Sequence, residues 1–277
     1  VLSISLIISQ DYPKKKFYKR EKHAAKIMGR DDRKYGDHSG NRVLCRFYNH
    51  GSIGDQSSSF SGVYPIGSGH SYIWEFSPVV AASVVDTNGF RRHIVSDGIS
   101  GLVDASPEGT PWSFEPLSGY SNPNQENLAM SDNKESWPNS WPNRTEDWNG
   151  EWNGQYGKYV RADQESYFVV DDRYNSEFEF WPDQNDIPED PTVSPDEHRR
   201  GLGIEMEARG YQWNHPAAED IIIVTYWITN VGSSVLDSVV FGMYGDADIG
   251  GASSFSDDDA WFDTENDMVY QLSLIHI

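Results

Sequence analysis

The segment from residue 219 to residue 267 constrains the fold more than any other part of the chain. An apolar run at residues 221–228 leads into an Asn-Val-Gly-Ser-Ser turn, and a second apolar run follows at residues 239–244. Apolar runs of this length, bounded by turn formers and rich in β-branched and aromatic side chains, are typical of buried β-strands. The segment therefore predicts a protein rich in β-structure.

The composition of the whole chain agrees with that prediction. Of its 277 residues, 13% are aromatic, and 24 glycines and 14 prolines supply many turns. An Asp-Thr-Asn-Gly sequence at residues 86–89 predicts a β-hairpin. Residues 202–209 alternate, so we expect one set of side chains in a core and the other outside: Leu202, Ile204, Met206 and Ala208 inside, and Glu205, Glu207 and Arg209 outside. These patterns predict an all-β fold of antiparallel, β-sandwich-like units with long loops rich in Trp, Pro, Asn and Gly.

The charge of the chain is strongly asymmetric. Residues 1–50 carry 12 Lys and Arg against 5 Asp and Glu, whereas the remaining residues carry 10 against 38. An acidic body repels phosphates, which argues against nucleic acid as a partner. The basic stretch fits a solvated tail, with contact to an anionic surface as the alternative. Cys45, the only cysteine, alternates with Val43 and Phe47 and is expected in the core.

Shifts in composition divide the chain into six parts. In order, we expect a signal-peptide remnant (1–9), a basic linker (10–40), a β-rich region (41–110), a Trp-rich loop region (111–160), a β-sandwich-like region with an acidic loop (161–271) and a short artefact (272–277). The last six residues resemble the translation of a sequencing-library adapter, which predicts that the natural chain continues past Gln271.

Residues 1–9 carry the expectation of export. They are too few to span a bilayer but fit the back half of the apolar core of a secretory signal, with an ordinary first strand as the alternative. We therefore expect an extracellular or cell-surface location and a protein that is not integral to a membrane. Extracellular polysaccharide or cell-surface components are the partners that such a location offers.

The acidic loop after residue 244 is a candidate calcium site. Carboxylates crowded past a strand end repel one another unless water or a shared cation separates them. Comparison with an EF-hand loop finds acids at three ligand positions but no flanking helices, so a β-sheet loop would hold the ion. The candidate ligands are Asp246, Asp248, Asp257, Asp258, Asp259 and Asp263. The alternative is a solvated acidic loop.

The Trp-rich loop region is a candidate carbohydrate site. Trp137-Pro-Asn recurs at Trp141, and Trp148-Asn-Gly recurs at Trp152. Exposed indole rings stack on the C–H faces of sugars, while Asn and Asp bind hydroxyls. The alternative is that these four rings plug the end of a β-sandwich.

Catalysis is the third function considered. Glycoside hydrolysis needs two carboxylates about 5–10 Å apart in a cleft, and the nearest candidates are Asp163, Glu165, Asp171 and Asp172, with Glu205 and Glu207 as a further pair. Pairs of this kind are common on solvent faces of an acidic chain. The sequence contains no nucleophile elbow, P-loop, HExxH or Cys/His metal pattern. A non-enzymatic role is therefore the expectation.

Several phrases of the sequence resemble those of large secreted β-rich proteins of environmental bacteria. The phrases lie at residues 148–157, 162–168, 210–213, 226–230 and 241–251. The resemblance implies export and a β-rich fold but brings no established activity. We therefore expect a secreted or cell-surface β module with a structural or adhesive role and calcium as a candidate stabilising ion. A carbohydrate-binding module and a polysaccharide-active enzyme are the alternatives.

Overall fold

The structure is a computed structural model that describes residues 2–4, 33–54, 59–86, 89–100, 112–175, 200–232, 235–250 and 258–273. It confirms the predicted all-β fold with antiparallel sheets. Within the described ranges the helical elements are two short 3₁₀ turns, η2 (Lys134–Ser136) and η3 (Glu146–Trp148). Most of the basic linker, the end of the chain after residue 273 and Asp257 lie outside the described residues.

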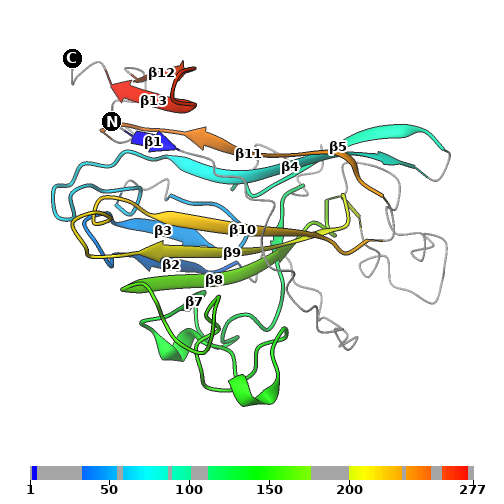
Figure 1. Ribbon diagram of the computed structural model, residues 1–277, viewed down its shortest axis with the longest axis horizontal. Helices are drawn as coiled ribbons and strands as arrows, with labels where there is room; N and C mark the ends of the chain where they lie inside the picture. Colours follow the sequence, from blue (N-terminus) through cyan, green and yellow to red (C-terminus); the bar gives the residue numbers. More distant parts are fainter. Residues whose placement is uncertain are drawn as a thin grey trace.

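Two sheets form the body of the molecule. The larger has the order β10 (Ile223–Asn230), β9 (Ile204–Gln212), β8 (Gln164–Asp171) and β6 (Glu115–Pro116), with β7 (Ala129–Met130) also paired to β8. The second has the order β11 (Asp237–Asp246), β4 (Glu75–Val85) and β5 (Arg91–Asp97). Figure 1 shows the second sheet above the first, as in a sandwich.

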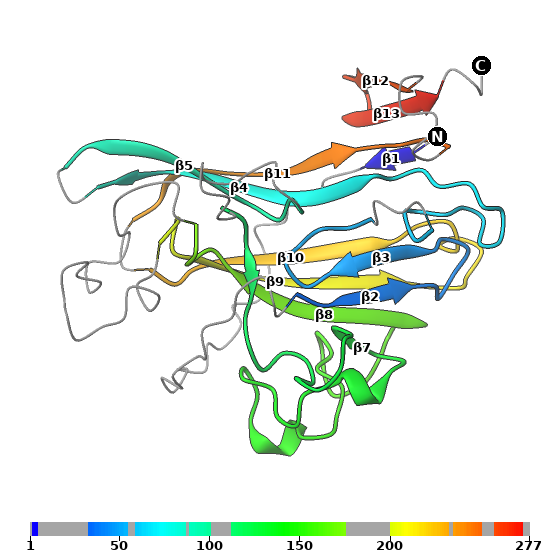
Figure 2. The ribbon, with the colours of Figure 1, turned by 180° about the vertical axis from the view of Figure 1, so that it is seen from behind.

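Two smaller sheets complete the fold. The hairpin of β2 (Tyr35–His38) and β3 (Cys45–Tyr48) packs against β8, with His38 Nε2 2.8 Å from Ser166 Oγ, and it contributes Cys45 to the core. Ile53 connects this hairpin to β4 through bridges to Phe47 and Phe76. Strands β1 (Leu2–Ile4), β13 (Met268–Ser273) and β12 (Asp258–Asp263) form a separate sheet beyond β11. The same layers are seen from behind in Figure 2.

The hydrophobic core lies between the two large sheets. Leu202, Ile204, Met206 and Ala208 are buried in it, as their alternation predicts, and so is Cys45. Strands β4 and β5 pair around the predicted Asp-Thr-Asn-Gly turn, with Val85 opposite Arg91. The short-range strand signals therefore identify this core correctly.

The two apolar runs at residues 221–228 and 239–244 correspond to strands β10 and β11, but the predicted burial of these strands is wrong. Strands β10 and β11 are half-exposed rather than buried, because each lies at the edge of its sheet and packs only one face inward. Strand β10 pairs with β9, whereas β11 crosses to the other sheet and pairs with β4. Strands from residues 41–110 and 161–271 thus share one sheet.

Strand β8 is buried on both faces. Phe168 and Val170 point into the core, whereas Tyr167 and Val169 point into a second cluster on the opposite side. We call this second group the buried aromatic cluster: Tyr120, Trp141, Trp152 and Tyr167, with Trp137 and Trp148 packed against it. The loops of residues 112–162, green beneath β8 in Figure 1, supply most of it.

Candidate functional site

The tryptophans predicted to stack on sugars lie mainly in the interior. Trp141 and Trp152 are each 2% exposed, and Trp152 packs against both Trp137 and Trp141 with ring centres 5.4 and 6.0 Å away. Trp148 is half-buried, and Arg144 lies over its ring at 4.3 Å. Trp141 and Trp152 therefore offer no free face to a ligand. Their packing matches the structural alternative, except that the rings cover a face of β8 rather than its end.

The acids that were candidates for catalysis accept hydrogen bonds from backbone amides, and this use is structural. The buried Glu165 carboxylate accepts hydrogen bonds from the Arg161 and Ala162 amides, at 2.6 and 3.1 Å, and from Trp152 Nε1 at 2.7 Å. Asp172 accepts from the amides of Leu202 and Ile204. A carboxylate that accepts several hydrogen bonds in this way stabilises the local structure. Its removal would leave buried N–H donors without an acceptor, which costs folding free energy.

The remaining acids of that group have local partners as well. Asp171 accepts from the Arg173 amide, and Asp163 accepts from the Asn214 amide at 2.7 Å. Glu207 accepts from the Tyr167 hydroxyl at 3.2 Å. These bonds join neighbouring loops and strands, which is a structural use of the charge.

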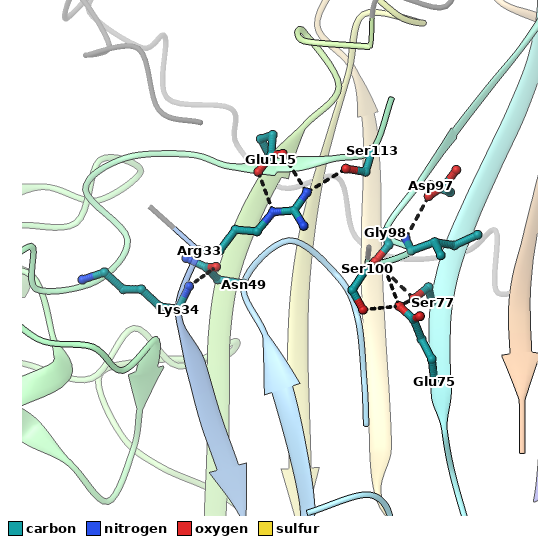
Figure 3. Close-up of polar contacts among 11 residues, drawn as sticks. Arg33, Lys34, Asn49, Glu75, Ser77, Asp97, Gly98, Ser100, Ser113 and Glu115 are labelled. Carbon is teal, nitrogen blue, oxygen red and sulfur yellow. Dashed lines mark hydrogen bonds and ion pairs between the residues drawn. The ribbon is translucent and has the colours of Figure 1, made fainter. Parts of the chain in front are cut away.

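A second group of buried polar residues ties the N-terminal side of the sandwich together. Figure 3 shows Arg33 paired with Glu115 and bonded to Ser113, and Glu75 bonded to Ser77 and Ser100. Arg33 Nε and Nη2 reach the two Glu115 oxygens at 3.0 and 2.7 Å, which is the bidentate geometry of a strong ion pair. The Arg33–Glu115 pair attaches residue 33 to β6, and the Glu75 bonds attach Ser100 to β4.

The acidic loop brings three of its predicted residues near one another. Burial raises the pKa of Asp248, and the charges of Asp258 and Asp246 raise that pKa further. Burial likewise raises the pKa of Asp246, with added repulsion from Glu75 and Asp258. Asp248 is 4% exposed, and its Oδ1 and Asp258 Oδ1 are buried without a hydrogen-bond partner.

The other acids of the loop lie apart from this trio. Asp259 is exposed, and Asp263 caps the β12–β13 turn, where the Asn266 side chain donates a hydrogen bond that lowers the Asp263 pKa. In the described part of the chain, no three His, Cys, Asp or Glu side chains are placed so that together they could hold a metal ion.

An aromatic surface that the sequence analysis did not single out lies at the end of β9. It consists of Tyr156, Tyr159, Arg161, Tyr211 and Trp213, and we call it the Tyr–Arg–Trp surface. Tyr156 and Tyr159 are 53% and 49% exposed, and Trp213 is half-buried. These three rings are accessible, in contrast to the buried aromatic cluster, whereas Tyr211 is only 7% exposed and supports Trp213 from beneath by ring stacking.

Hydrogen bonds join the two segments that build this surface. Tyr211 donates its hydroxyl to Gln155 Oε1 at 2.6 Å, and Trp213 Nε1 donates to the Arg161 carbonyl at 3.2 Å. The rings of Tyr211 and Trp213 are nearly parallel, 14° apart with centres 5.7 Å apart. Burial raises the pKa of Tyr211 to about 12, so its hydroxyl stays a donor at any physiological pH. The two segments are therefore held in a fixed relation.

Close backbone approach shapes the loop that carries the tyrosines. A Cβ on Gly154 would lie 2.5 Å from the carbonyl oxygens of Gly157 and Tyr159, and one on Gly157 would lie 2.5 Å from the Tyr159 ring. Only glycine fits at position 154, where the neighbours are backbone atoms, and a side chain at position 157 would displace the Tyr159 ring. The loop therefore folds tightly and holds Tyr159 over residue 157. The surface is thus ordered before any ligand arrives.

A sequence signal for this surface exists. Tyr211 and Trp213 are two residues apart on a strand, so they share a face, and the glycines of residues 154–157 mark a tight loop. What the sequence does not show is that residues 155–161 and 211–213 meet. That contact depends on the fold of β8 and β9.

Comparison with known proteins returned no match, whether the chain was compared with family models, curated proteins or solved structures. Among the described residues, no helix has the length and apolar content needed to cross a bilayer.

Proposed function

We propose that this chain is an exported, non-enzymatic β-sandwich module that adheres to carbohydrate through the Tyr–Arg–Trp surface. The observation that carries the proposal is that the accessible rings of Tyr156, Tyr159 and Trp213 are fixed beside polar groups at the end of β9. Aromatic faces with a few placed polar groups are the features by which proteins bind sugar rings. Sites built on strands and tight loops also lose little entropy on binding.

Two further observations favour binding over catalysis. The acids nearest the surface, Asp163 and Glu165, are occupied by backbone amides. The rings lie on an open surface rather than around a carboxylate pair. Adhesion to polysaccharide requires only this accessible surface, and it agrees with the expected location outside the cell.

The test is binding of the full chain to immobilised cellulose, xylan, mannan, chitin, pectin and alginate. We expect retention on at least one of them and a loss of about tenfold for Trp213→Ala, since one aromatic contact contributes about 1 kcal/mol. The matched control is Trp261→Ala, a 46% exposed tryptophan on β12. Equal retention of the two variants, or no retention of the parent chain, would refute the proposal.

Calcium stabilisation is a second proposal, and its support is the pair Asp248 and Asp258 rather than a cluster of three carboxylates. The two buried, unbonded oxygens of Asp248 and Asp258 are chemically suited to a hard cation. Thermal melts with calcium and with EDTA test it: a bound ion would raise the melting temperature by several degrees, and Asp248→Asn would abolish the rise. Asp259→Asn, an exposed neighbour, is the control. An unchanged melting temperature in the parent chain would reject this role.

A further inference from the structure

Arg161 is the only charged member of the Tyr–Arg–Trp surface. Its guanidinium carbon lies 4.9 Å from the ring centre of Tyr156 and 5.1 Å from that of Tyr159, and its Nη2 donates to the Tyr159 hydroxyl at 2.6 Å. These contacts fix the side chain at an exposed position. The guanidinium is therefore presented in a defined orientation.

Arg161 differs from the other exposed arginines of the described residues because no carboxylate there pairs with it. Among the exposed arginines of the described residues, Arg42 pairs with Asp220, Arg91 with Asp237 and Arg92 with Asp86. The exposed Lys134 also has no carboxylate partner in this part of the chain, but its ammonium lies over the Trp137 ring. In a chain with a net charge of −21, an exposed arginine without an acidic partner is unusual. Its five N–H donors include several that a ligand can use.

The nearest acids in sequence do not compete for this guanidinium. Asp163 accepts the Asn214 amide, and Glu165 is buried and accepts the Arg161 backbone amide itself. The net negative charge of the chain opposes a polyanion at long range. At physiological salt, however, charges are screened beyond about 8 Å, so the groups beside a short ligand decide its binding.

We infer that the Tyr–Arg–Trp surface binds an acidic sugar, with Arg161 pairing to a carboxylate or sulfate on a ring that stacks against the neighbouring aromatic side chains. An arginine fork matches a planar carboxylate with two parallel hydrogen bonds. The inference rests on the proposed function, since it names the ligand class of the same site.

The experiment uses the full chain and pairs of oligosaccharides that differ only in charge. The pairs are oligogalacturonate and its methyl ester, oligomannuronate and its methyl ester, and a sulfated and an unsulfated galactan fragment, with neutral gluco- and xylo-oligosaccharides added. Affinities are measured by calorimetry at about 0.15 M salt, where the screening length is about 8 Å. The variants are Arg161→Gln, Arg161→Lys and the control Arg91→Gln, which removes one exposed positive charge elsewhere.

We expect the tightest ligand to be anionic and to bind about tenfold or more tightly than its uncharged counterpart, because a charge-assisted hydrogen bond is lost in the latter. Arg161→Gln should remove this preference, Arg161→Lys should retain part of it, and Arg91→Gln should leave it intact. The carboxylate and sulfate pairs show which anion is preferred. A neutral oligosaccharide as the tightest ligand, or a preference that survives Arg161→Gln, overturns the inference but leaves the proposed function standing. Binding to none of these ligands overturns both.

Discussion

The buried aromatic cluster and the Tyr–Arg–Trp surface are built from the same kinds of residue, yet they differ in what their rings touch. Trp141 and Trp152 are 2% exposed and contact other rings, whereas Tyr156 and Tyr159 are about half exposed and contact a guanidinium. The cluster covers one face of β8, and the surface lies where that cover ends.

The difference shows that the accessible ring face, rather than the number of tryptophans, identifies a binding surface. The two regions are also physically linked. Glu165 bonds Trp152 Nε1 with one oxygen and the Arg161 amide with the other. The cluster therefore serves as the support on which the exposed loop rests, and each region should respond differently to substitution.

The largest expected effect is the loss of the central ring of the cluster. Trp152→Ala removes a buried indole and its bond to Glu165, so the free energy of unfolding should fall by about 3–5 kcal/mol. Urea denaturation measures the change. Trp261→Ala, which truncates an exposed ring on β12, should cost no more than about 1 kcal/mol. If both substitutions cost the same, the cluster is not the stabilising region described above.

The next effect concerns the carboxylate that joins the two regions. Glu165→Gln keeps the shape of the side chain but replaces an acceptor with an amide donor, which leaves a buried N–H unpaired. Stability should decrease by about 1–3 kcal/mol, and sugar binding should weaken because the Arg161 loop loses its anchor. The exposed Asp163→Asn is the matched control and should change both quantities less. An unaffected binding constant for Glu165→Gln would show that the two regions are independent.

The pH dependence of stability tests the sandwich core without involving the exposed surface. His38, on β2, is fully buried, and burial lowers its pKa to about 3 from the ordinary value of 6.5. The unfolded chain therefore binds a proton below pH 6.5 that the folded chain does not bind until about pH 3. Stability contributed by neutral His38 is present above pH 6.5 and is lost as the pH falls toward 3.

At pH 5 this loss amounts to about 2 kcal/mol, since each pKa unit is worth about 1.4 kcal/mol. Denaturation of the parent chain at pH values between 7 and 5 measures it. In addition, the imidazole resonances of His38 should not titrate above about pH 4. Titration of His38 near its ordinary pKa would contradict the burial of this side chain.

The smallest expected effect is the change in sugar affinity when Tyr159 loses its hydroxyl but keeps its ring. Tyr159→Phe removes the acceptor for Arg161 Nη2 but keeps the ring beneath the guanidinium. Because the arginine keeps its cation–π contact, sugar affinity should fall only about two- to threefold. Stability should stay within about 0.5 kcal/mol, since the group is exposed. A loss as large as that of Trp213→Ala would mean that the hydroxyl contacts the ligand directly.

The parts of the fold that depend on local pattern could be predicted from the sequence. Alternation placed Met206 and Ala208 in the core, and the Asn-Gly turn marked the β4–β5 hairpin. The pairing of β11 with β4 could not be predicted in this way, because these two strands lie far apart in the sequence. Arg209 is a similar case: its alternation predicted solvent exposure, but the Trp-rich loops cover it, and its guanidinium lies 3.8 Å from the Tyr167 ring centre.

The site was harder to predict than the fold. For Trp152 the sequence left two interpretations open, an exposed sugar platform and a ring packed against the sandwich, and its burial among the other rings agrees with the second. The Tyr–Arg–Trp surface joins residues about 50 positions apart, and no local pattern encodes that distance. Of the acidic loop, the sequence correctly indicated crowding of Asp246 and Asp248, which the raised pKa of each reflects.

The most direct measurement is hydroxyl-radical footprinting of the full chain with and without the tightest-binding oligosaccharide of the panel. Exposed rings are oxidised and a bound sugar shields them, so the modified residues map the ligand. We predict protection of Tyr156, Tyr159 and Trp213, and unchanged oxidation of Trp261 and Phe262 on β12. Protection of the β12 rings, with Tyr159 and Trp213 oxidised at the same rate in both samples, would contradict the account.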